Sequence, residues 1–127
     1  MYNPMQESFM DLTPTEFGQF SLDFLKEQTN NLPNVKFEHN KTIKIHDDNY
    51  QIDGYIEFEI MGVKYQTIVE CKHYKESISR EKLQVLNGKI ESMDAQKGIL
   101  ISSSNFQNGA REYAEIHGIA LMQLTEA

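Results

Sequence analysis

Two neighbouring segments in the middle of the chain alternate apolar with polar residues. They span 52–60 and 63–71, and Met61-Gly62 lies between them. A period of two on both sides of a short turn predicts a β-hairpin. With Ile60 facing Val63, the register places Asp53 directly across from Glu70. The face that carries Ile60 and Val63 is then predicted to meet the core, and the face that carries Asp53 and Glu70 is predicted to be polar.

The first helix is predicted from its starting signal. Thr13 has the side chain of an N-cap, Pro14 suits the first helical position, and Glu16 completes a capping box. Apolar residues follow at helical spacing. Asn30, Asn31 and Pro33 are expected to end this helix.

The remaining segments alternate between extended and helical patterns. We expect an extended segment at 35–45, a turn at 46–49, a helix from about Ser79, a buried strand at 98–101, a helix at 107–117 and a strand at 119–124. Together with the hairpin, this gives the order α-β-β-β-α-β-α-β. It predicts an α/β fold in which helices flank a mixed β-sheet. The chain lacks repeats and long linkers, so we expect a single domain over 1–127 with its core at about 13–124.

Charge is distributed unevenly along the chain. The 127 residues carry a net charge of −7, which argues against a simple basic coat protein for nucleic acid. The segment from Lys72 to Lys89 nevertheless holds five basic residues and two acidic ones. Such a stretch is either a solvated helix face or a surface that touches a polyanion. The single cysteine excludes an internal disulfide and is consistent with a reducing, cytoplasmic location.

Three charged residues form a candidate site on the predicted polar face. Like charges placed across a hairpin, as Asp53 and Glu70 are expected to be, are destabilising unless a cation neutralises them. Lys72 lies two residues after Glu70 and so points to the same face. Carboxylates with a nearby lysine suit Mg²⁺ and phosphate chemistry. The alternative is a sheet surface with incidental charges.

Several motifs resemble one family of nucleases. Gln51-Ile52-Asp53-Gly54 followed by Val69-Glu70-Cys71-Lys72 resembles the PD-(D/E)xK nucleases, specifically the Mrr-like restriction endonuclease domain. The runs Gly98-Ile99-Leu100-Ile101 and Gly118-Ile119-Ala120-Leu121 are similar to that domain as well. The likeness extends from about Thr13 to Leu124.

The resemblance implies a restriction-endonuclease-like core and metal-dependent hydrolysis of DNA phosphodiesters. By that likeness, Asp53, Glu70 and the Cys71 backbone carbonyl bind Mg²⁺, for which Mn²⁺ is expected to substitute. Lys72 is then catalytic, and Gln84 falls where relatives often place a polar active-site residue. Many relatives have a Phe-Glu pair on the first helix. Here the glutamate precedes Phe17, so Glu16 is either a further metal ligand or only the capping-box residue.

The expected partner is DNA, and no association with a membrane is expected. Candidate DNA contacts are His73, Lys75, Arg80 and Lys82, although His73 alternatively faces solvent. If the protein has sequence specificity for DNA, we expect it to come from a homodimer or from a separate recognition subunit. Two other functions stay open: a catalytically inactive nucleic-acid-binding or assembly module of the same fold, and a branched-DNA resolvase of the Holliday junction type.

Overall fold

Helices and strands follow the predicted order. The structure is a computed structural model that describes residues 11–29, 32 and 34–125. Its elements are α1 (Pro14–Gln28), β1 (Lys36–Ile45), β2 (Asp48–Ile60), β3 (Val63–Lys72), α2 (Arg80–Met93), β4 (Lys97–Ser102), α3 (Asn108–His117) and β5 (Ala120–Gln123). The predicted mixed α/β fold is confirmed.

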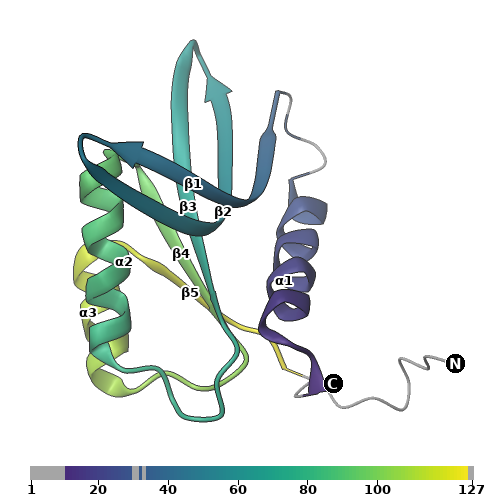
Figure 1. Cartoon of the computed structure of the whole chain (residues 1–127), viewed down its shortest axis with the longest axis vertical. Coiled ribbons are helices and arrows are strands. Elements are labelled where there is room, and N and C mark those ends of the chain that lie inside the picture. Colours follow the sequence, from purple (N-terminus) through teal and green to yellow (C-terminus); the bar gives the residue numbers. More distant parts are fainter. Residues whose placement is uncertain (1–10, 30–31, 33, 126–127) are drawn as a thin grey trace, which may run out of the picture.

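One five-stranded sheet forms the centre of the fold, with the strand order β1-β2-β3-β4-β5. β1, β2 and β3 pair antiparallel, whereas β3, β4 and β5 pair parallel. α1 covers one face of the sheet, and α2 and α3 cover the other (Figure 1). The parallel half requires crossover connections, which α2 and α3 provide.

The predicted hairpin register is confirmed along most of its length. Pairing runs from Ile60↔Val63 to Gly54↔Val69. Met61 and Gly62 both have positive φ, of 53° and 77°, as the two-residue type I′ turn requires. The ladder ends at Gly54↔Val69, one position before Asp53 and Glu70, so their predicted facing placement lies just beyond the paired part of the hairpin.

The prediction of one core face and one polar face was wrong. Buried clusters lie on both sides of the sheet, and Tyr55 and Ile68 pack with α2 and α3 on the side expected to be polar. At the hairpin tip, Ile60 and Val63 are 44% and 51% exposed, although they were expected in the core. The helices bury the body of both faces and leave this tip uncovered (Figure 1).

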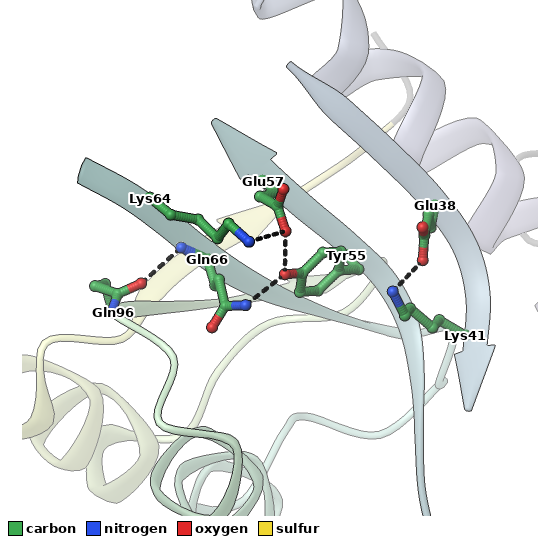
Figure 2. A network of polar contacts seen from close by, with 7 residues as sticks. All are labelled: Glu38, Lys41, Tyr55, Glu57, Lys64, Gln66 and Gln96. Atoms are coloured by element: carbon green, nitrogen blue, oxygen red, sulfur yellow. Dashed lines mark hydrogen bonds and ion pairs between the residues drawn. The ribbon is translucent and has the colours of Figure 1, made fainter. Parts of the chain in front are cut away.

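A polar network satisfies the buried phenol of Tyr55. Its hydroxyl donates to Glu57 Oε1 at 2.8 Å and accepts from Gln66 Nε2 at 2.7 Å. Figure 2 shows these contacts, together with the Lys64 ammonium beside Glu57. Burial, followed by the bond to Glu57, raises the pKa of Tyr55 to about 12. Tyr55 therefore acts as a structural residue of the sheet.

Local signals in the sequence match the ends of α1 and β1 only in part. The Thr13–Glu16 capping box is present, and α1 ends at Gln28 with Thr29 as its C-cap. The predicted stop residues Asn30, Asn31 and Pro33 lie outside the described part of the chain. The turn predicted at 46–49 is shorter, because Ile45 already pairs with Asp48. Within the described residues, no helix has both the length and the apolar character needed to cross a membrane.

Candidate active site

Asp53 lies where β2 and β3 stop pairing. Its Oδ2 accepts a hydrogen bond from the Cys71 backbone N–H at 2.7 Å. The next residue, Gly54, passes tightly under α1, because a Cβ there would lie 2.3 Å from a methyl carbon of Leu22. The carboxylate of Asp53 therefore replaces a backbone partner at this point and is held against the strand that carries Glu70.

Glu70 is a buried carboxylate, only 5% exposed. Its Oε1 accepts from Lys89 Nζ on α2 at 2.5 Å. Burial is the largest cause that raises the pKa of Glu70; the Lys89 bond opposes it, and the charge of Asp53 adds to it. Asp53 and Glu70 line the same cleft, and the negative charge of Asp53 disfavours the ionisation of Glu70.

Lys89 was not predicted as a site residue. Besides Glu70, its Nζ donates to the Gln51 backbone carbonyl at 2.9 Å, so it links α2 to both β2 and β3. The sequence held a signal for this position: Lys89 follows Leu86 by three residues, which continues the buried stripe of the helix. A lysine on the inward stripe of a helix needs a partner.

An open cleft of about 460 Å³ brings the predicted residues together. Its lining includes Asp53, Glu70, Lys72 and Lys89, and is completed by Pro14, Gln51, Cys71, His73 and Tyr74. A second hollow of about 270 Å³ shares Asp53 and Gln51 with it and continues toward His39 and Asn40. Asp53 and Lys72 are only partly buried at this cleft, whereas Glu70 lies deeper.

The ring of Tyr74, which lines this cleft, lies near the ammonium groups of two lysines. Lys72 Nζ is 5.9 Å from the centre of its ring, and Lys82 Nζ is 5.6 Å from it. Cation–π attraction at this range positions both ammonium groups weakly. The arrangement gathers positive charge beside the two carboxylates, as expected for a site that meets an anionic substrate.

Two predicted site residues lie away from the cleft. Gln84 is an exposed residue of α2 and does not line the cleft. Glu16 is exposed and serves the capping box, in which its Oε1 accepts from the Thr13 N–H at 2.9 Å. Hydrogen bonds from Thr13 lower the pKa of Glu16. The structure therefore favours the capping interpretation of Glu16.

Among the candidate DNA contacts, His73 and Arg80 also have structural roles. The His73 ring stacks on Phe17 at 4.8 Å and its Nδ1 lies 2.8 Å from Ser103 Oγ, so it is packed rather than facing solvent. Arg80 donates to the Gly109 carbonyl at 3.2 Å and so holds α3. Lys75 is exposed, and Lys82 lies beside Tyr74.

The Cys71 thiol is not suited to nucleophilic attack. Its side chain packs with the cluster under α1. Burial, followed by the charge of Asp53, raises the pKa of the thiol to about 12, which keeps it protonated at neutral pH. Any contribution of Cys71 to the cleft therefore comes from its backbone.

The donor atoms at the cleft fit a hard divalent cation. Within the described residues, no three His, Cys, Asp or Glu side chains gather as a metal cluster. Mg²⁺ commonly takes one or two carboxylates and fills its other positions with water and substrate oxygens. Asp53 and Glu70 meet that requirement, and Glu70 already attracts one cationic group, the Lys89 ammonium.

Comparison with known proteins places the chain in a family. A family model described as a restriction endonuclease, Mrr_cat, matches residues 9–126. The chain belongs to this restriction endonuclease family. The chain is 29% identical over 72 residues to the type IV methyl-directed restriction enzyme EcoKMrr of Escherichia coli (strain K12). That match covers 56% of the chain but only 23% of the length of the E. coli enzyme.

Several solved structures share the fold of this chain. A protein of unknown function, AF1548, matches with a TM-score of 0.66 and 17% identity, over 82% of this chain and 54% of its own. VC1899 from Vibrio cholerae matches with a TM-score of 0.59 and 15% identity, over 86% of this chain and 30% of its own. The DNA modification-dependent restriction endonuclease AspBHI matches with a TM-score of 0.52 and 14% identity, over 88% of this chain and 33% of its own. At these identities the likeness concerns the fold alone.

Proposed function

We propose that this chain is a metal-dependent DNA endonuclease that hydrolyses phosphodiester bonds in the cleft beside β3. The observation that carries the proposal is the convergence of Asp53, Glu70 and Lys72 on one open cleft. Membership of a restriction endonuclease family supports the choice of DNA as substrate. Fold alone would not carry it, because function depends on the site.

Asp53 and Glu70 would hold the metal, with the Cys71 carbonyl as a further oxygen ligand. When bound, Mg²⁺ neutralises phosphate charge and lowers the pKa of a coordinated water. Asp53 is already fixed for this task by its bond to the Cys71 N–H. Because β3 carries both Glu70 and Lys72, the orientation of that strand sets two of the three side chains.

Lys72 would orient the attacking water and stabilise negative charge that develops on the phosphate. Its half-buried side chain lines the cleft, and an ammonium partly removed from water stabilises such charge more strongly than a solvated one. Lys75 and Lys82 would contact flanking phosphates, and Tyr74 would lie between them and the site.

The decisive test compares DNA substrates, metals and variants. Purified chain is incubated with supercoiled, linear, branched and modified DNA, each with Mg²⁺, Mn²⁺ or EDTA. We expect metal-dependent cleavage that Lys72→Ala abolishes. Lys64→Ala is the matched control, because Lys64 lies on the same strand at the exposed hairpin. Cleavage by Lys72→Ala at the wild-type rate would show that the site is wrong.

A second candidate is DNA binding without cleavage. The Lys89–Glu70 ion pair favours it, because a buried lysine can replace a lost metal in a domain that kept only its fold. DNA binding that is unchanged by EDTA, with every substrate left intact, would support this function. Cleavage confined to branched DNA would instead indicate a junction resolvase.

A further inference from the structure

We propose that the Lys89 ammonium is a built-in counter-ion to Glu70, and that it competes with a divalent metal for this carboxylate and weakens metal binding. The inference rests on the proposed function, because it concerns the same two carboxylates. It adds a residue on α2 that competes with the metal for its ligands.

The contacts of Lys89 are those of a cation seated among hard oxygen donors. Its Nζ lies 2.5 Å from Glu70 Oε1 and 2.9 Å from the Gln51 carbonyl. Carboxylate and backbone carbonyl oxygens are the ligands that Mg²⁺ and Ca²⁺ use. The Lys89 side chain is only 22% exposed, so the ammonium is directed into the site and away from solvent.

Charge balance explains why the ammonium belongs there in the metal-free protein. Without Lys89, the buried Glu70 carboxylate would lie beside Asp53 with only Lys72 among the cleft residues to offset it. A buried charge without a partner is strongly destabilising. Lys89 therefore stabilises the Glu70 carboxylate by supplying the positive charge that a bound metal could also supply.

The same geometry sets the two cations in competition for the Glu70 carboxylate. The ammonium already occupies part of the acceptor capacity of this group. Repulsion between the ammonium and the ion would also act at short range in a partly buried site. Lys89 sits at the end of a flexible four-carbon stem, so it can leave Glu70 for the open cleft, which it also lines. There the Lys89 ammonium would form an ion pair with a DNA phosphate.

The test is a calorimetric titration of the full chain with Mn²⁺ alone, in the absence of DNA. We expect Lys89→Gln to bind Mn²⁺ at least about tenfold more tightly than wild type, because a nearby repulsive charge is removed. Lys89→Met, which keeps the apolar stem, should also bind more tightly. Lys89→Arg keeps the competing charge and should resemble wild type. Lys44→Gln is the control for loss of one positive charge, since Lys44 is exposed on β1.

The outcomes separate this inference from the proposed function. If wild type binds Mn²⁺ and cleaves DNA, but Lys89→Gln and Lys89→Met bind no more tightly, Lys89 does not compete and the inference fails alone. If no protein binds Mn²⁺ or cleaves, the proposed function fails and the inference with it. Tighter binding by Lys89→Arg would also overturn the inference. Thermal melting in EDTA identifies any variant that is unfolded, and the Met variant then decides.

Discussion

Asp53 Oδ2 and the Cys71 N–H are joined by a 2.7 Å hydrogen bond at the end of the β2–β3 ladder. The Asp53 carboxylate accepts from a backbone N–H that would otherwise bond to the carbonyl of a neighbouring strand. The bond therefore ties the position of one acidic residue to the backbone of the strand that bears Glu70 and Lys72. A change at Asp53 should affect structure as well as chemistry.

Asp53→Ala should lower the free energy of unfolding by about 1–3 kcal/mol, because the Cys71 N–H loses its acceptor in a partly buried place. Asp53→Asn keeps an acceptor oxygen and should lose much less stability. Both variants should lose metal-dependent cleavage. Urea unfolding of the two variants beside wild type, all in EDTA, measures the difference. Equal stabilities for Ala and Asn would show that the hydrogen bond contributes nothing.

Glu70→Gln should raise the thermal stability of the metal-free chain at neutral pH. Burial raises the pKa of Glu70, so its ionised form destabilises the folded state above the ordinary pKa. The gain should vanish at acidic pH, where Glu70 is protonated in both folded and unfolded chains. The Lys89 ammonium keeps partners in this variant, because the amide oxygen can still accept from it and the Asp53 carboxylate of the same cleft offsets its charge. Melting in EDTA at neutral and acidic pH measures the gain and its disappearance.

The same variant should lose the response to metal. Wild type should gain about 2.7 kcal/mol at a Mn²⁺ concentration of 100 times its dissociation constant. Glu70→Gln should gain far less, since a neutral amide is a poor ligand for a hard cation. A full metal shift in the variant would exclude Glu70 as a ligand.

Lys75→Gln combined with Lys82→Gln should weaken DNA binding and flatten its dependence on salt. Each lost phosphate contact lowers the slope of log affinity against log salt by about 1 on duplex DNA. Arg80 is left unchanged, because it also holds α3 through Gly109. Filter binding across a salt series measures the slope, with Lys44→Gln as the charge control. An unchanged slope would identify this stretch as a solvated face.

Glu16→Ala should destabilise the chain more at pH 7 than at pH 3. Hydrogen bonds from Thr13 lower the pKa of Glu16. A lowered pKa stabilises the folded state above the ordinary value of 4.5 and ceases to do so as the pH falls through the folded-state pKa. Thermal melting at the two pH values checks the sign. Mn²⁺ binding should be unchanged, and a loss of binding would restore Glu16 as a ligand.

Local signals predicted much of the fold. Thr13 and Glu16 indicated the start of α1, because a capping box depends only on residues close in sequence. The Met61-Gly62 turn fixed the hairpin register for the same reason. Asp53, Glu70 and Lys72 were brought to one cleft as expected, since neighbouring strands place them within reach of one another.

Burial depended on packing that strand alternation does not encode. Alternation at Ile60 and Val63 indicated a core face, yet among the described residues no helix reaches the hairpin tip. Tyr55 and Ile68 seemed to belong to a polar face because the helices that cover them come later in the chain. Lys89 was counted only as part of a basic stretch, since its partner Glu70 is set by the docking of α2 on the sheet.

The cleft draws its charged side chains from β2, β3 and α2, so 36 residues of sequence separate Asp53 from Lys89. During synthesis on the ribosome, Asp53, Glu70 and Lys72 are added to the chain before α2 is completed at Met93. Until that helix docks on the sheet, Glu70 lacks its contact with Lys89. The cleft is therefore complete only once α2 has docked on the sheet, so its assembly reports the late, long-range part of folding rather than the local hairpin.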